Sequence, residues 1–151
     1  MKIERILLAY DGSEASERAL DFAIELSTGK NTDLRILHVQ ANRGRSSIPV
    51  ELERFEEIEH IYMTEREILR GDAEQTIETA VNKARKAGLT NVTGEVREGD
   101  ATRAILDLAQ SLDCDLLVLG SRGLGDLQGL LLGSVSHKVM QAAPCSCVIV
   151  R

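Results

Sequence analysis

Short apolar runs alternate with segments of helical periodicity along this chain of 151 residues. Four of the runs are mostly apolar, which is typical of strands buried on both faces of a parallel sheet. The remaining run alternates Val92, Gly94 and Val96 with polar residues, and it predicts a strand with one exposed face. The predicted strands lie at 3–9, at 33–39, within 91–100, at 115–120 and at 145–150.

Three of the predicted helices have recognisable ends. Ser13 and Asp100 are suitable N-cap residues for the helices that begin directly after them. Gly29 is expected to end the first of these helices, and Pro144 to stop a helix over 134–143. The apolar stripe expected along the first helix consists of Ala15, Ala19, Phe22, Ala23 and Leu26.

A longer helical region follows a polar segment at 40–49 that is predicted to be a loop. Its apolar positions form two stripes separated near Gly71 and Asp72, so a helix that is kinked or split there is expected. Gly88 is predicted to end it. The first stripe is Leu52, Phe55, Ile58, Ile61 and Tyr62, and the second is Ile77, Ala80, Val81 and Ala84.

The alternation of strands and helices predicts a doubly wound α/β fold, one domain over residues 1–151, with helices on both faces of a five-stranded parallel sheet. We expect the strand order 3-2-1-4-5. In that order the winding reverses between the first and fourth strands, and ligands bind at the carboxyl ends of strands at such a point. These two strand ends fall at 11–13 and 120–123.

Composition and charge exclude several functions. The net charge of −6 argues against nucleic acid or an anionic membrane as partner, because both require a dense basic surface. Aromatic residues are only 3% of the chain and tryptophan is absent, so no stacking platform for bases or flavin is expected. The uncharged run 127–137 is too short to span a bilayer.

The amino terminus and the cysteines indicate a cytoplasmic protein. The opening segment carries no small-residue cleavage site after its apolar run and does not have the pattern of a secretory signal. Three cysteines are an odd number, which suits a reducing compartment. Cys145 and Cys147 are expected on one face of the last strand as small buried side chains, and the three histidines are expected to be structural or solvated.

The segment after the fourth strand is unusually rich in glycine and has the features of a phosphate site. Gly120 and Gly123 leave room for a ligand to approach the backbone, and Gly133 and Ser134 precede a helix whose first N–H groups favour an anion. Arg122 adds a positive charge in the loop. A P-loop and a dinucleotide fingerprint are both rejected, because their glycines would have to follow the first strand.

This spacing, GxxG followed after nine residues by Gly-Ser, resembles the ATP-binding motif of the universal stress protein family. The resemblance covers the whole chain: "ILLAYDGSEAS" is similar to the opening strand and turn of that family, "LHV" to the end of its second strand, and "APCSCVIV" to its closing segment.

The resemblance implies a set of nucleotide contacts. Asp11 would contact the ribose or adenine side, and Val39 would pack on adenine and bond it through its backbone. The glycines would line the ribose and phosphates, and a divalent ion, Mg or Mn, would accompany the phosphates. The residues implied in the loop and helix are Gly120, Arg122, Gly123, Gly133, Ser134, Val135 and Ser136.

The resemblance also implies a homodimer formed by the last strand. The apolar "CVIV" at that position supports this expectation, because exposed edge strands are usually covered or paired.

Three functions are weighed. The first is a regulatory module that binds ATP, hydrolyses it slowly at most, and presents its dimer surface to an unidentified regulatory protein. The second is an ATP-cleaving enzyme of the adenine-nucleotide α-hydrolase-like class, but the chain has "YDGSEAS" after its first strand where a Ser-Gly-Gly type loop is required. The third is a dimeric scaffold that binds no nucleotide, with the glycines serving loop geometry and Asp11 serving only the turn.

Overall fold

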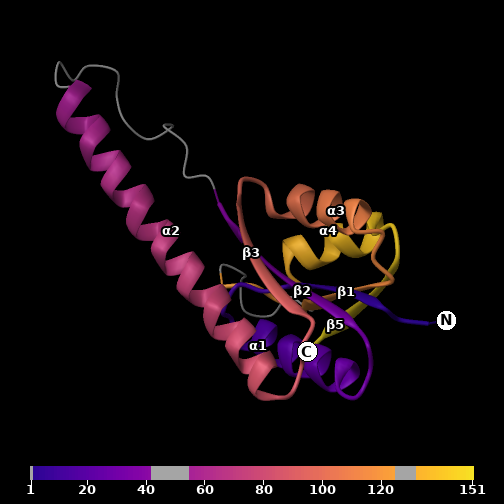
Figure 1. Ribbon diagram of the computed structural model, residues 1–151. Helices are drawn as coiled ribbons and strands as arrows, with labels where there is room; N and C mark the ends of the chain where they lie inside the picture. Colours follow the sequence, from indigo (N-terminus) through magenta and orange to yellow (C-terminus); the bar gives the residue numbers. More distant parts are fainter. Residues whose placement is uncertain (1, 42–54, 125–131) are drawn as a thin grey trace.

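The computed structural model describes residues 2–41, 55–124 and 132–151, with side chains described from residue 65 onward in the second of these segments (Figure 1). The strands are β1 (Arg5–Ala9), β2 (Asp33–Gln40), β3 (Val92–Glu98), β4 (Leu116–Gly120) and β5 (Ser146–Val150). The helices are α1 (Glu14–Ser27), α2 (Phe55–Lys86), α3 (Ala101–Ser111) and α4 (Ser134–Ala142).

The five strands form one parallel sheet in the order β3-β2-β1-β4-β5, which confirms the predicted fold and strand order. The central strand β1 pairs with β2 on one side and β4 on the other, so that Leu7 lies between Arg35 and Leu117. The sheet therefore reverses its winding beside β1, and the carboxyl ends of β1 and β4 lie next to each other.

Helices cover both faces of the sheet, as expected (Figure 1). Successive strand residues point to opposite faces, so Leu8 packs with the α1 and α2 side chains while Leu7 packs with those of α3 and α4. Both leucines are fully buried. The two apolar layers hold the strand ends in fixed positions.

The N-cap predictions are confirmed. The Ser13 side chain accepts a hydrogen bond from the Ser16 N–H, and the Asp100 side chain accepts one from the Arg103 N–H. The predicted apolar stripe on α1 needs one correction, because Phe22 is 36% exposed. The other four stripe residues are buried or half-buried.

The predicted break in the long helix is wrong, because α2 continues through Gly71 without interruption. A glycine in a helix interior costs only about 1 kcal/mol relative to alanine, and no proline accompanies it here. Strong helix formers on both sides keep the backbone hydrogen bonds in place.

The expected loop beyond residue 41 and the side chains of the first stripe lie outside the described residues, as do Gly125 and Gly129. In the part of the chain that is described, no helix is both long and apolar enough to cross a bilayer.

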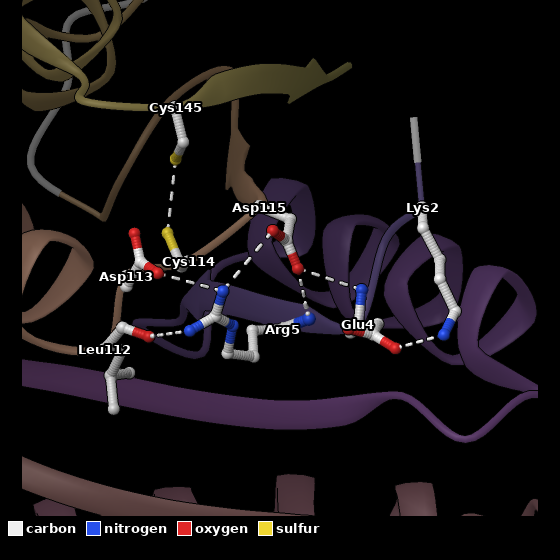
Figure 2. Close-up of polar contacts among 8 residues, drawn as sticks. All are labelled: Lys2, Glu4, Arg5, Leu112, Asp113, Cys114, Asp115 and Cys145. Carbon is white, nitrogen blue, oxygen red and sulfur yellow. Dashed lines mark hydrogen bonds and ion pairs between the residues drawn. The ribbon is translucent and has the colours of Figure 1, made fainter.

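The amino end of β1 is held by one carboxylate from the turn before β4 (Figure 2). Asp115 Oδ2 accepts hydrogen bonds from the backbone N–H groups of Glu4 and Arg5, each at 2.9 Å. The Arg5 guanidinium lies 3.7 Å from Asp115 Oδ1. The two backbone donors, and then the Arg5 charge, lower the pKa of Asp115 from its ordinary value of 3.8.

This pKa shift predicts a pH-dependent loss of stability. A carboxyl group whose pKa is lowered by folding stabilises the folded state above its unfolded pKa, and that contribution disappears as the pH falls through the folded value, below 3.8. The replacement Asp115→Asn is therefore expected to destabilise the protein at pH 7 and to make much less difference near pH 3. Urea unfolding of both proteins at the two pH values measures this. The exposed neighbour, replaced as Asp113→Asn, is the control, and a stability gap for Asp115→Asn that does not change with pH would contradict the assignment.

Candidate functional site

A cavity of about 350 Å³ opens at the carboxyl edge of the sheet, at the point where the winding reverses. The ends of β1, β2 and β4 form its floor, and the first turns of α3 and α4 form part of its walls. Eight of the nine residues expected at the site line this cavity: Asp11, Val39, Gly120, Arg122, Gly123, Ser134, Val135 and Ser136. The ninth, Gly133, is the N-cap residue of α4 directly beside them.

One side of the cavity is apolar. Val39 from the end of β2 lies with Ala101 and Ile105 from α3, and Leu37 and Leu119 complete this side. Val39 is half-buried, whereas Ile105 and the two leucines are buried. Such a surface suits the flat, weakly polar ring system of a ligand.

The strand β2 extends past the last residue that it pairs with β1. That last pair is Ala9 with Leu37, and the Leu37 carbonyl oxygen accepts from the Tyr10 N–H at 2.8 Å. Because strand backbone groups alternate in direction with a period of two residues, the Val39 N–H and C=O also turn toward the β1 side, beyond its paired residues. A ligand in the cavity can therefore meet the Val39 backbone as well as its side chain.

The opposite side of the cavity is the amino end of α4. The first N–H groups of an α-helix have no acceptor within the helix, and together with the helix dipole they favour an anion. The N-cap residue is Gly133, which provides no side-chain hydrogen bond to this turn. Its backbone is extended, with φ −71° and ψ 163°, and its carbonyl oxygen accepts the first helical bond from the His137 N–H.

Hydrogen bonds fix this helix end to the sheet. Ser121, directly after β4, accepts at its carbonyl oxygen from the Gly133 N–H at 2.6 Å and from the Ser136 hydroxyl at 3.1 Å. Ser136 is only 4% exposed. Its hydroxyl proton is therefore used in a hydrogen bond within the protein, and its hydroxyl oxygen can still accept a hydrogen bond. The exposed Ser134 has the side chain more accessible to a ligand.

Asp11 connects two loops. Its Oδ1 accepts from the Ser13 N–H at 2.9 Å, and its Oδ2 accepts from the Leu124 N–H at 3.1 Å. The carboxylate thus joins the turn before α1 to the glycine-rich segment 113 residues further along the chain. A carboxylate has about four acceptor sites, so Asp11 can still accept a hydrogen bond from a hydroxyl group of a ligand.

Gly120 is required by helix packing. A Cβ atom at this position would lie 2.7 Å from the backbone carbon of Ala15 and 2.8 Å from the backbone nitrogen of Ser16. The absent side chain therefore makes room for α1, which is a different reason from the ligand approach expected from the sequence. Gly120 still borders the cavity through its backbone.

Sequence reasoning missed the contribution of α3, of Tyr10 directly after β1 and of Ser16 in α1. Ala101, Ile105, Tyr10 and Ser16 all line the cavity. A usable signal for α3 was present: the Asp100 N-cap follows the third strand, so the first turn of that helix lies at the same carboxyl edge of the sheet. His38 has a structural position, as expected, since its Nδ1 lies 2.9 Å from the Tyr10 carbonyl oxygen.

A larger groove of about 640 Å³ lies between α2 and β3, away from the winding reversal. Charged side chains such as Arg70, Glu74 and Glu78 dominate its lining. The described residues that line it include no helix amino end, which is the feature that distinguishes the smaller cavity.

Comparison with known proteins gives consistent results. A sequence model of the universal stress protein family matches residues 2–151. The universal stress protein YxiE of Bacillus subtilis is 34% identical to this chain over 150 residues, which are 97% of this chain and 98% of the relative. The solved structure of the universal stress protein UspA from Lactobacillus plantarum has a similar fold, with a TM-score of 0.84 at 20% identity over 100% of this chain and 99% of the other. A solved universal stress protein in complex with cAMP has a TM-score of 0.70 at 26% identity, again over 100% and 99%.

Proposed function

The chain belongs to the universal stress protein family, and from this premise we propose that it is a regulatory protein that binds an adenine nucleotide, preferentially ATP, in the cavity at the carboxyl edge of its sheet. The proposal places it in the cytoplasm, where free cysteines remain reduced. Its nucleotide state would govern an interaction with a further regulatory protein.

The observation that carries the proposal is the pairing of an apolar wall with a helix amino end across one cavity. The wall around Val39 and Ile105 suits a purine ring, while the first turn of α4 suits phosphate oxygens. The related protein solved in complex with cAMP supports a ligand that combines these two chemical parts.

Each residue takes a role from its position in the cavity. Val39 would pack on adenine and form hydrogen bonds to it through the backbone. The Asp11 carboxylate would accept a hydrogen bond from a ribose hydroxyl in addition to the two that it already accepts. Gly120 and Gly123 would border the ribose and phosphates. The phosphates would be held by Ser134, Val135 and Ser136 in the first turn of α4, with Arg122 nearby. Gly133 would serve as the N-cap residue of that turn, because its N–H already donates to the Ser121 carbonyl oxygen.

A divalent ion, Mg or Mn, would enter with the phosphates. In the described part of the chain, no three His, Cys, Asp or Glu side chains are grouped so as to hold a metal. Magnesium commonly binds through substrate phosphates, waters and one or two carboxylates, so this lining is compatible with it. Asp11 is the carboxylate among the described lining residues.

Turnover of ATP would be slow at most. Phosphoryl transfer needs a group that orients the attacking water and several charges that stabilise the transferred group. Among the described residues that line the cavity, Arg122 is the one cation and Asp11 the one carboxylate, and the latter already accepts two backbone hydrogen bonds. This supports a binding protein over a fast ATP-cleaving enzyme.

The last strand would form a homodimer. β5 is the edge strand of the sheet beside β4, and its Val148, Ile149 and Val150 are only half-buried in one chain. A second copy paired along this edge would cover these apolar side chains.

The proposal is tested by identifying what the protein carries and what it rebinds. Freshly purified protein is denatured, the released nucleotide is identified by chromatography, and the emptied protein is titrated calorimetrically with ATP, ADP and AMP in the presence of magnesium. Release or rebinding of an adenine nucleotide is expected. If nothing is released and no binding occurs up to millimolar ATP, the proposed function is wrong and a scaffold without ligand is favoured.

Replacing Ser134 tests the phosphate contact directly. Ser134→Ala removes a hydrogen bond to a charged group, so a loss of about 1.5–3 kcal/mol, or roughly 10- to 150-fold in ATP affinity, is expected. The same calorimetric titration measures it. The matched control is Ser111→Ala at the far end of α3, where the hydroxyl donates to the Leu108 carbonyl oxygen. Equal affinities for wild type and Ser134→Ala would place the phosphates elsewhere.

A further inference from the structure

Two cysteines that are 31 positions apart in the sequence meet at the amino edge of the sheet (Figure 2). The Cys114 and Cys145 sulfur atoms are 3.2 Å apart. Cys114 lies in the turn before β4 and Cys145 directly before β5, and these two strands are paired neighbours. The sequence pattern grouped Cys145 with Cys147, but the sheet places its sulfur against Cys114.

The backbone around Cys114 is fixed by the end of α3. The Asp113 N–H donates to the Gln110 carbonyl oxygen at 3.0 Å, and the Cys114 N–H donates to the Ala109 carbonyl oxygen at 3.1 Å. These are the two hydrogen bonds of a Schellman motif, in which Asp113 takes the left-handed conformation with φ 49°. The motif turns the chain so that Cys114 follows immediately in a defined position.

Arg5 holds the same turn from the other side (Figure 2). Its guanidinium donates to the Leu112 carbonyl oxygen at 3.2 Å and lies 3.1 Å from Asp113 Oδ2. The residues before and after Cys114 are thus both attached to β1, through Arg5 and through Asp115. The backbone position of Cys114 is therefore fixed relative to the amino end of β1.

From this geometry we propose that Cys114 and Cys145 form a reversible intramolecular disulfide when the protein meets a hydroperoxide. The sulfur atoms need to approach from 3.2 Å to the disulfide bond length of about 2.05 Å. Adjustment of the two cysteine side chains would close this gap.

The reaction is balanced with a hydroperoxide as the oxidant. The Cys145 thiolate attacks one peroxide oxygen, the O–O bond breaks, and the leaving hydroxide or alkoxide takes up the proton lost by the thiol. Cys145 is then a sulfenic acid. The Cys114 sulfur attacks it, the S–O bond breaks and water leaves with the Cys114 proton. Two thiols have lost two electrons, and the hydroperoxide has been reduced to water and an alcohol, or to two waters.

The environments of the two thiols assign their order of reaction. Cys114 is 7% exposed, and burial raises its pKa to about 12, so it remains a thiol until its partner is oxidised. Cys145 is half-buried and therefore accessible to a small peroxide. It is the sulfur that reacts first.

The disulfide would tie β5 to β4 at the amino edge of the sheet, while the proposed nucleotide cavity opens at the carboxyl edge. The inference therefore does not depend on nucleotide binding. The bond closes a chain loop of 31 positions, which restricts the unfolded state and should stabilise the fold.

The test uses purified full-length protein, reduced, desalted and treated with stoichiometric hydrogen peroxide. Intact mass should fall by two hydrogens in the monomer, a Cys114 peptide should be cross-linked in a non-reducing tryptic digest, and dithiothreitol should reverse both changes. The melting temperature of the oxidised protein should rise by about 5 °C or more. There is no Lys or Arg between Cys145 and Cys147, so trypsin leaves both cysteines in one peptide. Cysteine variants are therefore needed to identify which of the two is bonded to Cys114.

Cys147→Ser is the matched control and should retain the cross-link, whereas Cys145→Ser and Cys114→Ala should abolish it. Cys145→Ser is the deciding variant because its half-buried position makes misfolding a minor concern. A cross-link that persists in Cys145→Ser, a disulfide between two chains, or oxidation of single cysteines without a cross-link would each overturn the proposal. Loss of nucleotide binding in any variant leaves these outcomes unaffected.

Discussion

Replacing Gly120 with alanine is expected to lower the free energy of unfolding by about 3 kcal/mol, at the upper end of the usual effect of overpacking. The new Cβ would lie 2.7, 2.8 and 2.9 Å from backbone atoms of Ala15 and Ser16. Backbone atoms cannot rotate aside as a side chain can, so α1 has to move away from β4. Thermal unfolding measures the effect, with an expected fall in melting temperature of about 6–12 °C.

Gly71→Ala is the matched control for this prediction. It makes the same chemical change in the interior of α2, where an added Cβ would meet nothing within 4 Å. Alanine is the better helix former, so this variant should be more stable by about 0.5–1 kcal/mol. If Gly120→Ala were as stable as wild type, the close packing of α1 on the end of β4 would be incorrect.

Placing a carboxylate on the apolar wall of the cavity is expected to reduce adenine nucleotide affinity by at least about 100-fold. Val39→Asp would put an unpaired charge where the purine ring is proposed to lie, and burying such a charge is strongly unfavourable. Calorimetric titration with both ATP and adenosine measures the loss. Because the proposed contact is with the base, the affinities for both ligands should fall together.

Comparison with Ser134→Ala separates the two halves of the site. That variant removes a proposed phosphate contact, so it should lower the affinity for ATP and leave the affinity for adenosine unchanged. Ala41→Asp is the charge control, since Ala41 is exposed and is not among the residues lining the cavity. If Val39→Asp lowered the affinity for ATP but not for adenosine, the proposed placement of the base against Val39 would be wrong.

The sequence predicted those features that depend on local pattern. Ser13 and Asp100 are recognisable N-caps because a side-chain oxygen satisfies an N–H group only three residues away. The strand order followed from the alternation of strands and helices, which restricts a parallel sheet to few topologies. The position of the cavity followed from that order, because ligands bind where the winding reverses.

The features that the sequence did not predict depend on contacts between distant segments. Position 120 requires glycine because the backbone of Ala15, which belongs to another element, lies too close to leave room for a side chain. The proximity of Cys114 and Cys145 arises from the pairing of β4 with β5, which no spacing in the sequence reveals. The error at Gly71 has another cause: a gap between two apolar stripes does not by itself interrupt the backbone hydrogen bonds of a helix, and one glycine costs only about 1 kcal/mol.

The peptide groups of Ser121 have a consequence for the entropy of binding. Its N–H donates to the Val150 carbonyl oxygen at 2.7 Å, and its carbonyl oxygen accepts from Gly133 and Ser136, so both lone pairs are in use. The edge strand, the end of β4 and the start of α4 are thereby joined at one residue. An anion that arrives at α4 meets a helix end already ordered by the fold, and little conformational freedom is left to be lost on binding.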